Sequence, residues 1–391
     1  MASLRSSSQP ISQTLQIYLK SFDQQHDSLL SPTRNVSFYR HGIPSFRCTV
    51  VRISNQAQAL IDSIQVSEVP VLSCEEVIKR LRLSRERYKD KQEFPAMYSS
   101  VFGGITTDPA AMVIPMDDHM VHRGHGVFDT ALIMDGHLYE LDEHLDRFLR
   151  SASVAKINLP FDRERMRNIL IQTVSTSKCR EGCLRYWLSS GPGDFLLSPS
   201  GCSQSALYAI VIKYLYSSDY SGIKVVTSSI PIKPPMFATM KSINYLPNVL
   251  CQMEAEERGC FASIWLDSDG FVAEGPNMNV AFVTKEKELL MPKFDKILSG
   301  CTAKRVLALS EELVKKGEIK GVCVRDVTVE EGKRADEMML LGGGVLVRPV
   351  IQWDDQVIGN GKEGPVAQAL LNLILEDMKS GPPTVRVPVP Y

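Results

Sequence analysis

Apolar and polar positions alternate along the first half of the chain in the pattern of β-strands. The clearest run spans residues 127–134, and Asp135-Gly136 then supplies a two-residue hairpin turn into residues 137–139. Helical periodicity follows over 142–156 and 163–177. Further strand-like runs lie at 97–102, 111–114, 183–189 and 206–214. These elements predict a small α+β domain over residues 97–216.

In the second half of the chain, short strands alternate with longer helices. A polar stretch, Ser217 to Gly222, predicts a linker over 217–222 and a large domain over 223–391. The expected strands are 223–228, 262–266 and 279–283, and the expected helices are 246–258, 302–316 and 363–379. Asp267 to Gly270 is read as a hairpin turn, because the glutamate that would complete a calcium loop is missing.

The segment before residue 97 has a different character. Ser73 and Glu76 have the spacing of a capping box, which predicts a helix within an accessory extension over 56–96. Residues 1–55 are rich in serine and carry six basic side chains against two acidic ones, Asp23 and Asp27. This composition predicts a transit peptide, with a disordered tail as the alternative. High serine content without an Arg-rich amphipathic helix favours the chloroplast stroma over the mitochondrion.

Composition excludes several classes of function. The formal net charge is −1, and basic residues form no stripe interleaved with aromatics, which argues against nucleic-acid binding. No apolar run reaches the ~18 residues that a membrane span needs. The nine cysteines are an odd number without a C-x-x-C pair, which favours free thiols in a reducing compartment and gives no reason to expect a metal site.

Two residues first suggest chemistry. Lys241 stands just before an apolar helix start, in Met-Lys-Ser-Ile-Asn-Tyr-Leu, away from other charges. Most lysines lie on solvated surfaces, so alone it is a weak signal. Glu274 ends an expected strand and opens a Gly-Pro turn.

Two further features suggest anion binding. Arg147 lies on an expected helix four residues after Glu143, where a plain ion pair is the simpler interpretation. Ser299-Gly300-Cys301-Thr302 leads directly into a helix, whose first N–H groups bind anions, with Thr302 able to cap or to donate its hydroxyl. A lysine, a carboxylate, an arginine and a phosphate-type helix start match what pyridoxal 5′-phosphate (PLP) requires.

The motifs around these residues resemble those of fold-type IV PLP enzymes, the class-IV aminotransferase family. The matching runs are E-H-L-D-R ending at Arg147, K-S-I-N-Y-L-P-N starting at Lys241, E-G-P-N-M-N starting at Glu274, and G-C-T starting at Gly300. The resemblance covers about residues 97–379 and is strongest to plant chloroplast D-amino-acid transaminase and aminodeoxychorismate lyase-like proteins. It implies an α/β fold, with an α+β N-terminal domain, an α/β barrel-like C-terminal domain and the cofactor between them, in a homodimer.

The same resemblance implies a role for each motif. Lys241 would bind PLP covalently and serve as the catalytic base, and Glu274 would face the pyridine nitrogen. Tyr245 corresponds to a tyrosine near the cofactor's phenolic oxygen, although a packing role is an equal alternative. The phosphate would be held by Arg147, Cys301, Thr302 and the backbone near Met278 and Asn279.

Substrate recognition departs from the family pattern. Phe128 stands where many relatives have a tyrosine that helps to fix the substrate carboxylate. Residues 191–195 also lack the Arg-x-His carboxylate trap of bacterial D-amino-acid aminotransferases. Arg123 and the amides of Gly343 and Gly344 are therefore the candidate anchors, although a loop ion pair and a tight strand turn would explain them equally well.

The resemblance predicts a transaminase that moves an amino group from a D-amino acid to a 2-oxo acid such as 2-oxoglutarate or pyruvate. The main alternative is 4-amino-4-deoxychorismate lyase, which releases pyruvate to give 4-aminobenzoate for folate biosynthesis. A PLP-binding protein without turnover is a third possibility, which intact Lys241 and Glu274 argue against.

Overall fold

A computed structural model describes residues 69–87, 92–213 and 219–391. The predicted transit peptide and part of both the accessory extension and the linker lie outside these described residues. Contacts group Cys74–Tyr391 into one unit, which holds every helix and strand discussed below. None of the described helices is long and apolar enough to cross a membrane.

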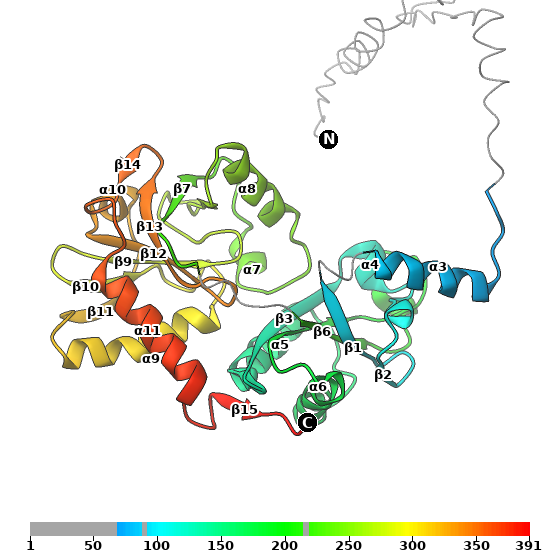
Figure 1. The fold of residues 1–391 in the computed structure, drawn as a ribbon. Coiled ribbons are helices and arrows are strands. Elements are labelled where there is room, and N and C mark those ends of the chain that lie inside the picture. Colours follow the sequence, from blue (N-terminus) through cyan, green and yellow to red (C-terminus); the bar gives the residue numbers. More distant parts are fainter. Residues whose placement is uncertain (1–68, 88–91, 214–218) are drawn as a thin grey trace, which may run out of the picture. The chain divides into compact units, whose positions relative to one another are not determined.

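The first sheet is antiparallel and has seven strands in the order β15-β4-β3-β5-β6-β1-β2 (Figure 1). The strands are β1 (Glu93–Ser99), β2 (Gly104–Thr106), β3 (Gly126–Met134), β4 (His137–Tyr139), β5 (Gly182–Ser189), β6 (Ala206–Lys213) and β15 (Arg386–Pro388). Helices α5 (Leu141–Val154) and α6 (Arg163–Ser177) supply side chains to the apolar core of this sheet, as Leu145 and Leu170 show.

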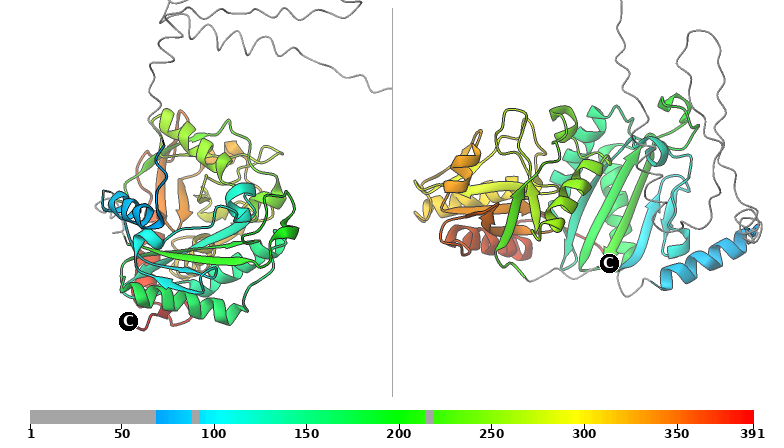
Figure 2. Two further views of the ribbon diagram at one scale, coloured as in Figure 1. Left: turned by 90° about the vertical axis from the view of Figure 1, so that its right-hand side faces the viewer. Right: turned by 90° about the horizontal axis from the view of Figure 1, so that it is seen from above.

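The second sheet is mixed and has the order β11-β10-β9-β12-β13-β7-β8. Its orange strands lie apart from the cyan strands of the first sheet in the right-hand view of Figure 2. Its strands are β7 (Ile223–Thr227), β8 (Ala262–Ile264), β9 (Asn279–Val283), β10 (Glu288–Met291), β11 (Gly321–Val324), β12 (Glu337–Gly342) and β13 (Leu346–Trp353), with β14 (Gln356–Val357) paired to β13. The helices are α7 (Pro235–Ala238), α8 (Leu246–Glu257), α9 (Cys301–Lys315), α10 (Val329–Arg334) and α11 (Pro365–Ser380). Every residue of β9 and β12 is buried, as expected for central strands covered on both faces.

The chain's last strand returns to the first sheet. After α11, β15 pairs antiparallel with β4, and the Tyr391 hydroxyl donates to the carbonyl of Cys179. Along the sequence, the strands of the second sheet follow the expected linker, and those of the first sheet precede it except for β15. The C-terminal strand β15 follows the linker but pairs with the first sheet. The domain boundaries drawn from the sequence stay a prediction.

The strand predicted at 111–114 is wrong. Asp108 caps a short 3-10 helix, η1 (Pro109–Ala111), by accepting from the N–H of Ala110, and residues 112–115 are irregular. Pro109 and Pro115 bracket the segment, and their fixed φ and missing N–H groups disfavour a strand. The expected accessory helix is present as α3 (Cys74–Glu86), where Arg82 pairs with Asp108.

Candidate functional site

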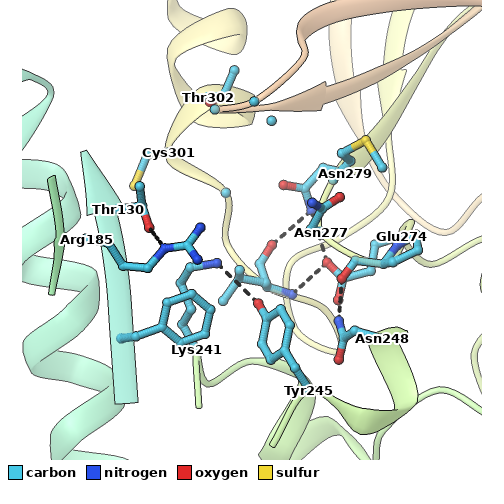
Figure 3. Close-up of a pocket in the computed structure, with 18 of the residues that line it drawn as sticks. Thr130, Arg185, Lys241, Tyr245, Asn248, Glu274, Asn277, Asn279, Cys301 and Thr302 are labelled. Carbon is cyan, nitrogen blue, oxygen red and sulfur yellow. Dashed lines mark hydrogen bonds between the residues drawn. The ribbon is translucent and has the colours of Figure 1, made fainter. Parts of the chain in front are cut away.

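A cavity of about 920 Å³ gathers most of the residues singled out from the sequence (Figure 3). The first sheet and α5 contribute one side of it, and the loops before α8 and α9 contribute the other. Its lining includes Phe128, Thr130, Arg147, Arg185, Lys233, Lys241, Tyr245, Asn248, Glu274, Met278, Asn279, Cys301, Thr302, Gly343 and Gly344. Such a pocket has the size of a cofactor-plus-substrate site.

Lys241 is held in place by its backbone. Its N–H donates to the Ser151 hydroxyl at 3.1 Å, and its carbonyl accepts from the N–H of Phe128 at 3.0 Å. The next residue, Ser242, forms a bridge with Val127 of β3. The backbone of Lys241 and Ser242 therefore pairs with the start of β3, and the amine of Lys241 lies in the cavity.

Two aromatic side chains surround the amine of Lys241. Its Nζ donates to the Tyr245 hydroxyl at 3.2 Å and lies 4.7 Å from the centre of the Phe128 ring. The two rings meet edge to face, with centroids 5.0 Å apart. Phe128 thus contributes a cation–π contact where the family's tyrosine would contribute a hydroxyl.

Glu274 is buried on the other wall of the pocket. Its Oε2 accepts from the N–H of Leu298 at 3.2 Å and from the Asn279 amide at 3.4 Å. Burial raises the pKa of Glu274 to about 8, against the opposing charges of Lys233, Lys241 and Arg147. A carboxyl group in this state is ready to share a proton with a basic ring nitrogen.

Arg147 is paired with Asp129 of β3. Its Nε donates to Asp129 Oδ2 at 2.9 Å and its second Nη to Oδ1 at 2.7 Å, while the other Nη donates to the carbonyl of Ser299. His144 also bonds Asp129, at 2.8 Å. Burial disfavours the charge of Asp129, but Arg147 and His144 hold its pKa far below the usual range. The bidentate partner is therefore Asp129, not Glu143 as the helical spacing suggested.

The start of α9 reaches the cavity beside Arg147. Gly300 is the N-cap residue, and Cys301 and Thr302 follow in the first turn, where N–H groups lack helical acceptors. A Cβ on Gly300 would collide with the Asn279 side chain, so glycine permits this close approach. This turn and the Arg147 guanidinium together form a site suited to a phosphate group.

The candidate substrate anchors separate into two groups. Gly343 and Gly344 line the cavity, and a Cβ on either would project into open space. Arg123 lies outside the cavity lining: its guanidinium donates to the carbonyls of His122, Phe195 and Leu196. The loop interpretation of Arg123 is therefore the one that its contacts support.

Arg185, Lys233 and Asn248 are among the polar residues of the cavity that were not singled out from the sequence. Arg185 of β5 points into it and donates to Thr130 at 3.1 Å, while Lys233 precedes α7. Asn248 Oδ1 is buried without a hydrogen-bond partner among the described residues. The alternation of β5 could have suggested that Arg185 faces the same side as Cys183. No feature of the sequence around Lys233 distinguishes it from a surface lysine.

These residues fit PLP. One cavity holds the three kinds of group that PLP needs. Lys241 offers an amine for its aldehyde and Glu274 a buried carboxyl for its ring nitrogen, while Arg147 and the start of α9 offer a positively charged site for its phosphate. The unpartnered Asn248 oxygen and the open space at Gly343 and Gly344 show that the cavity is shaped for a polar occupant.

Comparisons with known proteins agree with this geometry. Residues 126–353 match the model of the family described as amino-transferase class IV. The chain is 69% identical over 330 residues to "D-amino-acid transaminase, chloroplastic" of Arabidopsis thaliana, which covers 84% of this chain and 87% of that protein. It is 30% identical over 284 residues to "D-alanine aminotransferase" of Bacillus licheniformis, covering 71% of this chain and 97% of that protein.

Solved structures show the same fold. The branched-chain amino acid aminotransferase of Thermobaculum terrenum, solved in its PLP form, superposes with a TM-score of 0.67. The match covers 77% of this chain and 100% of that one at 22% sequence identity, so it speaks for the fold alone.

Proposed function

The chain belongs to the class IV aminotransferase family, and from this premise we propose that it transfers amino groups from D-amino acids to 2-oxo acids. One observation carries the proposal: the cavity that joins Lys241 to Glu274 belongs to a chain 69% identical to a protein named D-amino-acid transaminase. The direct test is to incubate the purified protein with D-alanine and 2-oxoglutarate and to identify glutamate and pyruvate by mass.

The cofactor of this family is PLP, and we propose a residue of the cavity for each of its parts. Lys241 would hold it covalently, Glu274 would face its ring nitrogen and Tyr245 its phenolic oxygen. Its phosphate would be held by Arg147, Thr302, Cys301 and the backbone near Met278 and Asn279. When bound, PLP supplies an electron sink for the charge left when a substrate Cα–H bond breaks.

The proton transfers fall to Lys241. Once an amino acid displaces it, its free amine lies where it can remove the α-proton and return it to another carbon. The amine of Lys241 lies 3.2 Å from the hydroxyl oxygen of Tyr245, and the ring of Phe128 restricts the movement of the lysine side chain and the access of water to it. A positioned acid–base group of this kind contributes about 10²–10⁴-fold to the rate.

We assign the substrate carboxylate to Arg185 together with the amides of Gly343 and Gly344, in place of Arg123. Arg185 carries a guanidinium within the cavity, and Thr130 fixes only its Nε. Its two terminal nitrogens keep a fork suited to a carboxylate. Arg185→Gln should raise KM for the amino donor more than it lowers kcat, with Arg123→Gln as the matched control outside the cavity.

The lyase remains the second candidate because of one feature of the pocket. Thr130, whose position in the sequence resembles one where bacterial lyases also carry threonine, lies in the cavity as the hydrogen-bond partner of Arg185. Against it, the substrate of the lyase carries two carboxylates, whereas we assign only Arg185 of the cavity's arginines to a substrate carboxylate, because Arg147 is paired with Asp129.

We propose a homodimer in the plastid stroma. Apolar side chains of α7 and α8 are exposed, and two of them, Val249 and Met253, also line the cavity; the set is Met236, Phe237, Leu246, Val249, Leu250 and Met253. Exposed apolar residues on neighbouring turns of a helix are typical of an interface, and a second copy of the chain is the proposed occupant. Light scattering should give twice the mass of the chain, and Leu250→Glu should reduce it. The plastid location rests on the name of the Arabidopsis relative.

A further inference from the structure

One buried carboxylate outside the cavity lining joins the segments that supply the proposed phosphate site. Asp377 of α11 is 8% exposed and is not among the residues that line the cavity. Its Oδ2 accepts from the hydroxyl of Tyr139 at 2.5 Å and from Nε of Arg305 at 2.7 Å, and its Oδ1 accepts from an Nη of Arg305. None of the roles above uses these three residues.

The two partners of this carboxylate belong to the segments that carry the phosphate-binding groups. Arg305 lies on α9, about one turn after Cys301. Tyr139 is the last residue of β4 and stands two residues before α5, the helix that carries Arg147. The two segments also meet at the site itself, where Arg147 donates to the carbonyl of Ser299 at 3.3 Å. They are therefore joined twice, once at the phosphate site and once through the carboxylate.

The junction around Asp377 combines apolar packing with directional bonds. Tyr139 belongs to the same buried cluster as Val306 of α9 and Ile374 of α11. Burial and the hydrogen bond to Asp377 raise the pKa of Tyr139, so its hydroxyl keeps its proton and donates. Hydrophobic packing is non-directional, whereas a bidentate pair of arginine and carboxylate fixes orientation as well as distance. The pair of Arg305 and Asp377 is therefore suited to fix the position of α9 against α11 and β4.

The position of α9 matters more to the phosphate than to the amine of the site. The N–H groups of its first turn act on an anion only within hydrogen-bond distance. A helix that shifts as a rigid body transmits a displacement at Arg305 to Cys301 and Thr302. The backbone of Lys241 is held instead by Ser151 of α5 and by β3. Loss of the pair should therefore weaken the grip on the phosphate selectively.

We propose that Asp377 is a positioning residue for the cofactor phosphate: together with Tyr139 it holds Arg305, and so places the first turn of α9 within reach of the phosphate. This inference rests on the proposed binding of PLP at this helix start. It adds residues outside the cavity to those that determine the affinity for the cofactor.

The test separates the phosphate from the rest of the cofactor. The full-length, cofactor-free protein is titrated with PLP and with pyridoxal, which lacks the phosphate, and absorbance gives the two dissociation constants. Asp377→Asn keeps the size of the side chain but removes the charge that pairs with Arg305. It should reduce the preference for PLP over pyridoxal by at least about fivefold. Tyr139→Phe removes only the hydroxyl and should reduce the preference by a smaller factor.

Asp354→Asn is the matched control. Asp354 also accepts from a cation, Lys333 at 2.7 Å, and from Thr227, but it lies in the turn after β13 and not on a segment that reaches the cavity. This variant should lower the melting temperature without changing the preference for PLP. A merely structural role of Asp377 would likewise lower the melting temperature and weaken the binding of both ligands equally.

An unchanged preference for PLP in Asp377→Asn, or the same loss of preference in Asp354→Asn, would overturn the proposal. If Asp377→Asn does not fold, Arg305→Lys gives the same comparison, because lysine keeps the charge but lacks the fork. A wild-type protein that binds pyridoxal as tightly as PLP would overturn the proposed phosphate site together with this inference. A wild-type preference that persists unchanged in the variants would overturn this inference alone.

Discussion

At the residue scale, the four motifs read from the sequence named residues that the fold brings into one cavity. Lys241, Glu274, Arg147 and Thr302 all line the same cavity, as their family runs suggested. Arg185 and Lys233 were missed because their place in the cavity depends on which sheet edge and which loop meet in space. Arg123 lies outside the lining of the cavity, and its guanidinium donates to loop carbonyls, while its role toward a substrate stays a prediction.

Glu274→Gln should keep PLP bound but lower turnover by at least about 10²-fold. Glutamine has the size and hydrogen bonds of the carboxyl but cannot hold a ring nitrogen as a cation. Absorbance of the bound cofactor measures the retention of PLP, and steady-state kinetics measure the turnover. Turnover near wild type in a variant that has retained its cofactor would contradict the assigned role.

The same carboxyl predicts a pH effect on the stability of the cofactor-free protein. Its pKa is raised to about 8 in the folded state from 4.5. The stability it contributes is therefore complete below pH 4.5 and is lost as pH rises through 8. Glutamine does not titrate, so Glu274→Gln should gain in melting temperature relative to wild type between about pH 5 and about pH 9. A difference that stays constant with pH would contradict the raised pKa.

Arg147→Ala should lose both cofactor affinity and stability. Removing the guanidinium leaves the buried carboxylate of Asp129 with His144 as its remaining charged partner, and the loss of one partner of a buried ion pair costs up to about 3–5 kcal/mol. Activity should return only with excess PLP, measured by titration of the cofactor-free protein. Arg147→Lys is the control, since it keeps a charge near Asp129 but lacks the bidentate fork.

At the element scale, long periodic segments were predicted well and short irregular ones were not. The hairpin of β3 and β4 follows the Asp-Gly signal, and α5, α6, α9 and α11 lie where their periodicity placed them. The strand expected at 111–114 failed because Asp108 and the flanking prolines outweigh its apolar residues. β15 has only three residues, and its pairing with β4 could not be read from so short a run.

Gly300→Ala tests the start of α9 as the anion site. The added methyl group would meet the Asn279 side chain, so either that amide or the first turn of the helix must move. The affinity for PLP should fall while the fold persists, as equilibrium titration and circular dichroism would show. Gly321→Ala is the matched control, because open space surrounds that position. Equal affinities in the two variants would argue against a phosphate at this helix start.

At the scale of the whole molecule, the sequence predicts that residues 1–55 are a leader which the folded unit does not need. Contacts place Cys74–Tyr391 in one unit, and the last strand and Tyr391 join the end of the chain to the first sheet. A protein that starts at Gln56 should therefore fold, bind PLP and be active at a level close to that of the full chain. Aggregation of the truncated protein, or loss of its dimer, would show that residues 1–55 are structural and would weaken the plastid assignment.

The choice between transaminase and lyase also belongs to the whole molecule, because both reactions use the same Lys241 and differ in the rest of the cavity. The transaminase must admit two different amino acids in turn, which suits a cavity of about 920 Å³ in which Arg185 is the assigned carboxylate anchor, while Arg147 is paired with Asp129 and Lys233 lies beside Tyr245. The lyase must fix a ring with two carboxylates, for which a second fixed cation would be expected.

The deciding quantity is the ratio of kcat/KM for D-alanine with 2-oxoglutarate to kcat/KM for aminodeoxychorismate. We expect the transaminase value to be the larger, and D-alanine to exceed L-alanine as donor. Arg185→Gln should reduce kcat/KM for both reactions. This variant therefore tests the carboxylate anchor that both reactions would use and does not distinguish between them. Pyruvate release from aminodeoxychorismate that is faster by more than about tenfold, equivalent to roughly 1.4 kcal/mol in transition-state binding, would make the lyase the principal activity.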